Sequence, residues 1–362
     1  MRKYFLATLL FACTMGYAQK QEYRGIDSIL LPVAGKQPIN AVVLIADKGK
    51  VVYEKAMGYR RFADKEPLQK TDVFELASVS KQFTAMVIMM LHEKGLLQYD
   101  DLVEKYLDIP YKGITIRHLL THTSGLPDYQ EIMDTHWDKS KVAGNPDILA
   151  YLNQYAPPKL FEPGEKYRYS NTGYVLLASI AEKLSGRDFI EFCQAEIFRK
   201  LGMKHTAIRT LAEKAAVKNF AIGHIYVKEK NDFIRADSFP SSDYTIWLGN
   251  RKGPGRISST AQDLLKWDQA LYTEKLVKQS TLAEAFQPMV LNNGSISHYG
   301  FGWIPVTDDP SGLIVWHNGD NPGYKTEIMR FIGKQKTLII LCNNASDQFE
   351  NTIQQIRNLL TR

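Results

Sequence analysis

Segments rich in apolar and β-branched residues lie near both ends of the chain, and helical periodicity lies between them. Residues 42–46 and 51–55 flank the turn sequence Asp47-Lys48-Gly49-Lys50, which predicts a β-hairpin. Further strands are predicted around residues 221–227 and in the last third of the chain, at 299–306, 312–319, 325–332 and 336–343, with a turn at 333–336.

The most apolar helix is predicted in the stretch ELASVSKQFTAMVIMMLHEKGLL, which begins at Glu75, and it ends near Lys94-Gly95. Because this helix is apolar almost all round, we expect it in the middle of the protein. Its methionines are expected to fill the core: Met86, Met89 and Met90. Other helices are predicted at 174–186, 188–203 and 259–272, and from about Ser346 to Leu360.

This order of elements predicts an α/β (α+β) fold, in which one antiparallel sheet is built from both ends of the chain. Terminal helices are expected to cover the sheet, and a mostly helical lobe is inserted between its two parts. We expect a single domain over residues 19–362, made of a sheet lobe (about 25–75 and 295–362), a helical lobe (about 78–205) and a mixed segment (about 206–294).

The first 18 residues have the composition of a secretory signal peptide. Arg2 and Lys3 precede an apolar run that ends in the small residues before a cleavage site after Ala18. This pattern predicts an exported, periplasmic protein. The alternative is a lipoprotein anchored at Cys13, although Phe11 suits a lipobox poorly and no acidic or serine-rich tether follows Cys13. No later apolar run is long enough to predict a membrane span.

Composition is that of an ordinary globular protein, with 44% hydrophobic and 23% charged residues in 362. The net charge of +6 falls to +4 without the leader, and the basic residues are scattered, so nothing predicts nucleic-acid binding. Cys193 and Cys342 are expected to be buried free thiols rather than a disulfide. No Cys/His cluster predicts a metal, and no cofactor is expected.

Ser78 and Lys81 stand three residues apart at the start of the apolar helix, which puts the hydroxyl and the amine on one face. A lysine desolvated there has a lowered pKa and can accept the serine proton. The helix N-terminus favours negative charge that develops near Ser78. The alternative is a lysine at the edge of the core whose amine reaches solvent.

Two further motifs follow along the chain. Tyr169-Ser170-Asn171 offers a hydroxyl that can relay a proton and an amide that can hold an amine or a carbonyl. His317-Asn318-Gly319 follows a predicted strand, where a glycine lets a substrate backbone approach or pair with the strand edge.

In this order the three motifs resemble the S-x-x-K, Y-x-N and H-x-G signature of the serine β-lactamase and penicillin-binding protein family. The branch is the one that class C β-lactamases share with D-peptidases and esterases. Other stretches also resemble this branch: HLLTHTSGLPDY, FEPGEKYRYSNTGYVLLASIAEKLSG, IFRKLGMKHT, SSTAQDLLKW and YGFGW. The resemblance covers about residues 25–362.

The resemblance implies a role for each matching residue. Ser78 is the acylated nucleophile, Lys81 its base, and Tyr169 a proton shuttle. Asn171 orients Lys81 or the substrate amide. His317 stands in the place of the third motif's basic residue, and Gly319 lies at a strand edge. The oxyanion hole is expected to be formed by the backbone N–H groups of Ser78 and Asp320.

Two residues depart from the class C pattern. His317 stands where that class has lysine and is mostly neutral near neutral pH, which disfavours efficient β-lactamase activity. The carboxylate of Asp320 lies at the mouth of the expected oxyanion hole, where it repels anionic substrates if it faces the site.

Three functions are considered, each with a small molecule or a peptide as the substrate. The sequence does not indicate the oligomeric state. The first is an exported serine hydrolase of D-amino-acid peptides or amides, such as cell-wall fragments, that reacts slowly with penicillins. The second is a carboxylesterase with a more apolar pocket. The third is a catalytically idle penicillin-binding or scaffolding protein, against which the three intact motifs argue.

Several residues have two interpretations. His118 and His122 have a spacing that can hold zinc, but a structural role is favoured. Trp303 and Trp316 fit a strand core and a pocket wall equally well. Arg256 either binds a substrate carboxylate or is solvated in a loop, and the loop is favoured.

Overall fold

The computed structural model describes residues 23–31, 36–308 and 311–361 of the chain. The predicted signal peptide at 1–18 and the alternative anchor Cys13 therefore lie outside the described residues. No helix in the described ranges combines the length and the apolar composition needed to cross a bilayer.

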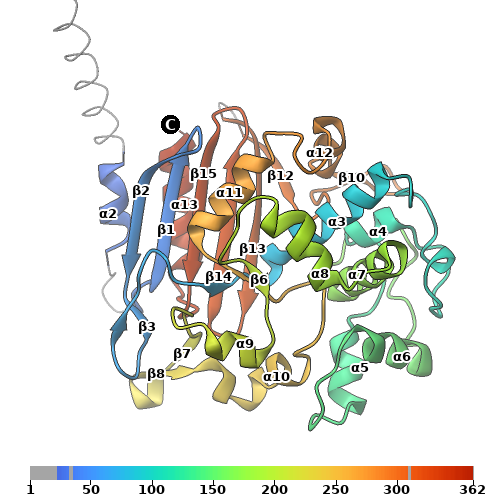
Figure 1. Ribbon diagram of the computed structural model, residues 1–362, viewed down its shortest axis with the longest axis horizontal. Helices are drawn as coiled ribbons and strands as arrows, with labels where there is room; N and C mark the ends of the chain where they lie inside the picture. The colour runs from blue at the N-terminus through green and yellow to red at the C-terminus, as the bar shows by residue number, and fades with distance from the viewer. Residues whose placement is uncertain (1–22, 32–35, 309–310, 362) are drawn as a thin grey trace, which may run out of the picture.

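A six-stranded antiparallel sheet forms the left half of the molecule (Figure 1). Its strands, in spatial order, are β12 (Ile304–Asp308), β13 (Gly312–Asn321), β14 (Tyr324–Phe331), β15 (Lys336–Cys342), β1 (Ala41–Asp47) and β2 (Lys50–Met57). The N-terminal hairpin joins the C-terminal strands where β1 pairs with β15, from Ala41↔Cys342 to Asp47↔Lys336. The sheet is thus built from both chain ends, and the predicted hairpin and last four strands are confirmed.

Helices cover both faces of the sheet, so its central strands are buried on both sides. Val42 and Leu44 belong to the core shared with α3 (Lys81–Glu93) and α11 (Ala261–Ala270). The alternating neighbours Val43 and Ile45 pack with the terminal helices α2 (Arg24–Ile29) and α13 (Phe349–Thr361). Burial on both faces explains why these strands are continuous apolar runs.

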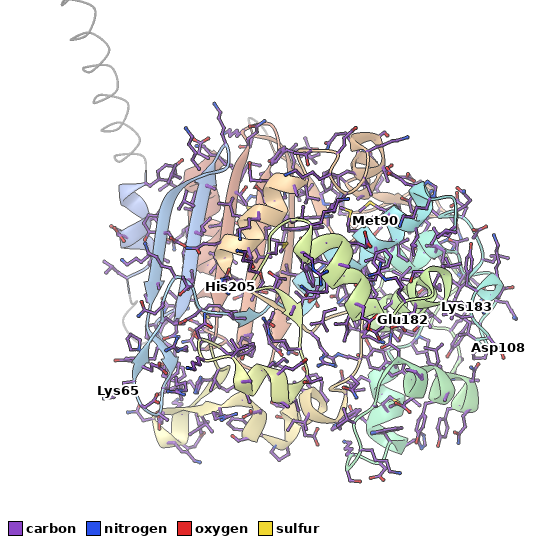
Figure 2. The ribbon with its side chains drawn as sticks, viewed as in Figure 1. Lys65, Met90, Asp108, Glu182, Lys183 and His205 are labelled. Carbon is purple, nitrogen blue, oxygen red and sulfur yellow. The ribbon has the colours of Figure 1, made fainter. Side chains whose placement is uncertain are left out.

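The inserted lobe is mostly helical and lies beside the sheet (Figure 1). Its helices are α4 (Ile116–Leu120), α5 (Tyr129–His136), α6 (Asn145–Tyr155), α7 (Asn171–Ser185) and α8 (Phe189–Cys193). Helix α3 runs between this lobe and the sheet, and Met86, Met89 and Met90 are buried in the core as predicted. Figure 2 shows Met90 within the interior and Lys65 at the edge of the molecule.

The remaining elements are short. The helices are α9 (Leu211–Ala216), α10 (Tyr244–Trp247) and α12 (Gln279–Ala285), and the strand groups are β3 (Tyr59–Arg61) with β4 (Glu66–Pro67), β7 (His224–Val227) with β8 (Asp232–Arg235), β10 (Met289–Val290) with β11 (Ile296–Ser297), and β5 (Phe74–Glu75), β9 (Ile257–Ser259) and β6 (Ala207–Ile208). Two predictions were wrong in extent. The strand expected at 221–227 begins only at His224, and the helix expected at 188–203 changes after Cys193 into a π-helical segment, η3 (Gln194–Arg199).

Four residues with two interpretations pack in or against the core. Trp303 is buried in the core that includes α3, Trp316 is partly buried against the core that includes α13, and neither lines the cleft of Ser78. Cys193 and Cys342 are buried free thiols, as predicted.

A buried ion pair joins α11 to the sheet. Arg330 Nε donates to Asp268 Oδ1 over 2.6 Å, and the two side chains are 1% and 0% exposed. The guanidinium also lies 4.6 Å from the centroid of the Tyr272 ring. Removing one partner of such a pair leaves the other charge buried and uncompensated.

We predict that Asp268→Ala lowers the free energy of unfolding by about 3–5 kcal/mol, because it strands the Arg330 guanidinium. Urea denaturation followed by circular dichroism measures this. The matched control is Asp134→Ala, whose ion pair with Lys139 (3.2 Å) has both side chains more than 40% exposed and should cost below about 1 kcal/mol. Equal losses in the two variants would contradict the role of burial.

Candidate active site

Ser78 lies in a single 3-10 turn, η1 (Ala77–Ser80), between strand β5 and helix α3. Ala77 has a φ of 48°, a left-handed conformation that a residue with a Cβ rarely adopts. The preceding residue holds this backbone in place. Leu76 N donates to Ile257 O over 2.8 Å, and Leu76 O accepts from Thr326 Oγ1 over 2.8 Å. The strained turn before the serine is thus fixed from two sides.

The Lys81 amine is fully buried and contacts three groups from distant parts of the chain. Its Nζ lies 3.0 Å from Ser78 Oγ, 2.9 Å from Asn171 Oδ1 and 2.9 Å from Pro254 O. Burial lowers the pKa of Lys81 well below its usual value, and the positive charge of Arg251 lowers it further, while Asp128 opposes both.

The three groups around Lys81 determine which hydrogen bonds its amine makes when it is uncharged. The carbonyl oxygens of Asn171 and Pro254 only accept, so they take the two N–H groups of the amine. Only the Ser78 hydroxyl can donate to the remaining lone pair. Asp128 orients the Asn171 amide, because its Oδ2 lies 3.2 Å from Asn171 N and 3.4 Å from Nδ2.

Tyr169 also reaches the serine. Its hydroxyl lies 2.7 Å from Ser78 Oγ, and its ring centroid is 4.7 Å from Lys81 Nζ. Desolvation raises the pKa of Tyr169, so the phenol keeps its proton near neutral pH. Tyr169, Ser78 and Lys81 therefore form a continuous path for a proton.

Strand β13 presents an unpaired edge beside Ser78. Within the described part of the chain it pairs with β12 only up to Trp316, whereas its residues 317–321 pair with β14 alone. Gly319 permits the close approach of η1, because a Cβ at this position would lie 2.2 Å from Leu76 O. The next residue, Asp320, is exposed and lines the cleft of Ser78, and partial burial raises the pKa of its carboxyl.

His317 lies behind this edge, with its side chain 1% exposed. Nδ1 lies 2.6 Å from Asn318 O, which only accepts, so Nδ1 carries the proton and Nε2 accepts from the Tyr299 hydroxyl over 2.7 Å. Burial, with a smaller effect of Lys81, lowers the pKa of His317 to about 3. The imidazole is therefore neutral and supplies no positive charge to the cleft.

The cleft around Ser78 has a volume of about 70 Å³ and contains residues that the motifs did not indicate. Gln130, Tyr244 and Arg251 line it together with Asn171 and Asp320. Asn321 also lines a larger cavity of about 750 Å³. The only sequence signal for Arg251 was the glycine-rich stretch GNRKGPGR, which does not by itself indicate a site.

The favoured interpretation of Arg256 was wrong. Its side chain is not solvated but 8% exposed, and it lines the same cleft as Ser78. Its guanidinium donates to Arg209 O, and its φ is 77°. Because an arginine rarely adopts this left-handed backbone conformation, the surrounding structure must hold the loop in place beside the nucleophile.

The two histidines of HLLTH have separate surroundings. His118 caps α4, since its Nδ1 accepts from Thr115 N over 3.2 Å. His122 is buried beside the site, where Nδ1 accepts from Ser170 N over 3.2 Å and the ring packs 4.2 Å from that of Tyr169. Among the described residues, no third metal-binding side chain joins them.

The structure thus brings the three motifs to one point between the sheet and the helical lobe. A serine within hydrogen-bonding distance of a buried lysine, on this mixed antiparallel fold, defines a serine hydrolase. The Beta-lactamase family model matches residues 33–361, so the chain belongs to that family.

Relatives of several kinds share this fold. The chain is 39% identical to Penicillin-binding protein 4* of Bacillus subtilis (strain 168) over 339 residues, which are 92% of this chain and 75% of the relative. Two solved structures are each 22% identical: EstCE1, a hydrolase with promiscuous acyltransferase activity (TM-score 0.78, 96% and 100% of the two chains), and D-amino acid amidase from Ochrobactrum anthropi SV3 (TM-score 0.74, 95% and 97%).

Asp128 gives a test of the electrostatics around Lys81. We predict that Asp128→Asn lowers the pKa of Lys81 further, because it removes a negative charge that raises this pKa. The acidic limb of kcat/KM against pH for a p-nitrophenyl ester then moves to lower pH. The control Asp138→Asn removes an exposed carboxylate and leaves the limb in place. A limb that stays or moves to higher pH in Asp128→Asn would show that this charge does not act on the base.

Proposed function

We propose that this protein is an exported serine hydrolase that cleaves peptides or amides of D-amino acids through an acyl-serine intermediate. The observation that carries the proposal is the hydrogen-bonded path from Tyr169 through Ser78 to Lys81, beside the open edge of β13. Relatives named as a penicillin-binding protein and a D-amino acid amidase support it.

Acylation begins with a proton transfer. Neutral Lys81 accepts the hydroxyl proton of Ser78 as Oγ forms a bond to the substrate carbonyl carbon. The backbone N–H groups of Ser78 and Asp320 stabilise the resulting oxyanion. The C–N bond then breaks, and the amine leaves with a proton that reaches it from Lys81 through Tyr169.

Deacylation reverses the direction of the proton. A water molecule adds to the acyl-serine ester and gives a proton through Tyr169 to Lys81. When the ester bond breaks, this proton returns to Ser78 Oγ, and the free acid leaves. Because Lys81 begins and ends neutral, its lowered pKa lets the cycle run near neutral pH.

Substrate alignment is assigned to the β13 edge. An extended peptide can add to residues 317–321 as a further strand, with Gly319 keeping this edge close to η1. His317 stabilises the edge through Tyr299 but is neutral, so it gives no attraction for the carboxylate of a β-lactam. We therefore expect reaction with penicillins and at most weak β-lactamase turnover.

The polarity of the cleft separates this function from an esterase. Arg251, Arg256 and Asp320 all line the space next to Ser78, whereas a pocket for small acyl esters is expected to be mainly apolar. The likeness to EstCE1 extends to the fold but carries no information about the lining of this cleft.

We predict that Ser78→Ala abolishes both hydrolysis of a D-Ala-D-Ala peptide and the mass adduct with a fluorescent penicillin. The substitution removes the Ser78 Oγ atom to which the acyl group would be attached. Intact-mass analysis and an assay of released D-alanine measure this, with a thermal melt as the test of folding. The control is Ser80→Ala in the same turn, whose hydroxyl accepts from Ile257 N over 3.2 Å and which should keep the adduct. Hydrolysis by Ser78→Ala within tenfold of wild type would rule out the acyl-serine.

A further inference from the structure

Tyr169 lies on a segment that has no helix or strand of its own, so other parts of the chain must fix its position. Residues 156–170 connect α6 to α7 without regular secondary structure. The backbone groups of such a segment need partners elsewhere. Three of its N–H groups find them in the chain after α4: Leu160 N donates to Gly125 O and Gly164 N to Thr123 O, each over 2.8 Å, and Arg168 N donates to His122 O over 2.9 Å.

His122 contacts Tyr169 and the residues on both sides of it. Its backbone oxygen accepts from Arg168 N, and its ring Nδ1 accepts from Ser170 N over 3.2 Å. Between these two hydrogen bonds, the His122 ring centroid lies 4.2 Å from that of Tyr169. One residue therefore holds the tyrosine by the backbone before it, by the backbone after it and by its ring.

His122 is itself held in a conformation that is rare for its residue type. Its φ is 57°, in the left-handed region, and it is 1% exposed. The rings of Tyr299 and Tyr174 pack against the imidazole, with centroids 4.6 and 5.1 Å away. The Tyr174 hydroxyl in turn donates to Leu120 O over 2.9 Å. A strained residue that its surroundings fix beside a nucleophile indicates a functional constraint.

The protonation of the ring argues against a direct part in proton transfer. Because Nδ1 accepts from Ser170 N, the proton of the neutral ring lies on Nε2, which makes no hydrogen bond within the described residues. Burial lowers the pKa of His122 well below its usual value, and Lys81 and His317 lower it further. The imidazole is therefore uncharged near neutral pH, and its only accepting nitrogen is already occupied. Its contribution to the site is geometric.

We propose that His122 is a positioning residue for Tyr169, which holds the phenol hydroxyl where it can pass a proton to the amine that leaves the substrate. This inference rests on the proposed function, in which Tyr169 delivers that proton. An imidazole suits this task because it offers one acceptor to Ser170 N and a flat face to the phenol. Displacement of a reacting group by about 1 Å can lower a rate about 100-fold.

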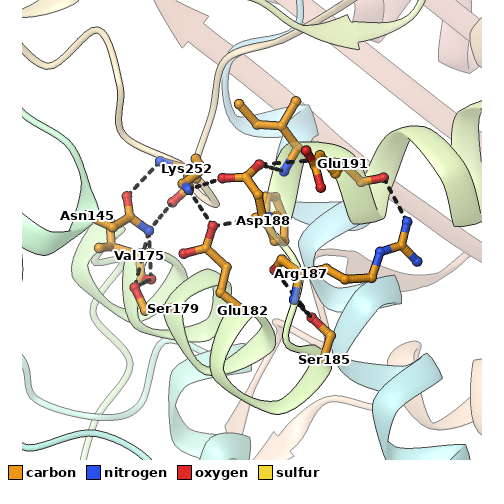
Figure 3. Close-up of polar contacts among 11 residues, drawn as sticks. Asn145, Val175, Ser179, Glu182, Ser185, Arg187, Asp188, Glu191 and Lys252 are labelled. Carbon is orange, nitrogen blue, oxygen red and sulfur yellow. Dashed lines mark hydrogen bonds and ion pairs between the residues drawn. The ribbon is translucent and has the colours of Figure 1, made fainter.

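The base is anchored by a different part of the chain. Lys81 Nζ donates to Pro254 O, and the loop that carries Pro254 is fixed to the helical lobe by Lys252 (Figure 3). Lys252 Nζ contacts Glu182 of α7 and lies 2.7 Å from Asp188 Oδ2, and its backbone N donates to Asn145 Oδ1 over 2.7 Å. A change at His122 is therefore expected to displace Tyr169 rather than the base.

The test compares two substrates with the same acyl group, N-acyl-D-Ala-D-Ala and the p-nitrophenyl ester of N-acyl-D-alanine. The amine of the peptide needs a proton as the C–N bond breaks, whereas p-nitrophenolate leaves without one. Since kcat/KM reports the steps up to release of the leaving group, the ratio of the peptide value to the ester value measures proton delivery. His122→Leu removes the acceptor for Ser170 N, and we expect it to lower this ratio about tenfold or more.

His122→Asn is the matched variant. Its side chain has the branched shape of leucine, places an acceptor oxygen where Nδ1 lies and tolerates a left-handed backbone, so it should restore much of the ratio. The control His118→Leu removes another imidazole whose Nδ1 accepts a backbone N–H, from Thr115 over 3.2 Å, and should keep the wild-type ratio. Partial unfolding lowers both rates together and leaves the ratio unchanged.

Tyr169→Phe removes the hydroxyl itself and should lower the ratio at least as far as His122→Leu does. An unchanged ratio in His122→Leu, or a ratio in His122→Asn no higher than in His122→Leu, overturns the inference and leaves the proposed function standing. If wild type does not cleave the peptide, the proposed function fails, and the inference fails with it.

Discussion

The burial of one lysine amine is the constraint on which the rest of this structure depends. Lys81 points from the start of α3 into a space without solvent, where a charge is costly. Its three polar contacts come from Ser78, Asn171 and Pro254, which are up to 176 residues apart along the chain. The helical lobe, which supplies Ser78 and Asn171, and the mixed segment, which supplies Pro254, must therefore both fold correctly before the amine has its hydrogen-bond partners and its pKa is lowered.

The strained and crowded backbone around the serine follows from the same requirement. For Ser78 to meet Lys81 and Tyr169 at once, Ala77 takes a left-handed conformation and Gly319 packs against Leu76 O. The edge of β13 at residues 317–321, which pairs with β14 on its other side and with no further described strand, lies beside the nucleophile. One local geometry thus places the serine hydroxyl, the lysine amine and the edge of β13 side by side.

The sequence predicted what is local and missed what only packing decides. The strand patterns at both chain ends are strong, so the sheet could be expected. The meeting of the motifs around Ser78, Tyr169 and His317 was implied only by their resemblance to the signature of a known family. Arg251 and Arg256 could not be expected, because their environment depends on how a glycine-rich loop packs against α6, α7 and α3. The orientation of the His317 ring could not be predicted either, since its partner Tyr299 contacts it only in the folded protein.

The most direct test of this account is a titration of Lys81 itself. Proteins labelled with ¹³C at lysine Cε, with the Lys81 resonance identified by its loss in Lys81→Ala, can be followed by NMR as the pH is raised. We predict that Lys81 loses its proton at a distinctly lower pH than the exposed lysines, because its ammonium form is desolvated. Titration of Lys81 together with the exposed lysines would contradict its role as the neutral base that activates Ser78.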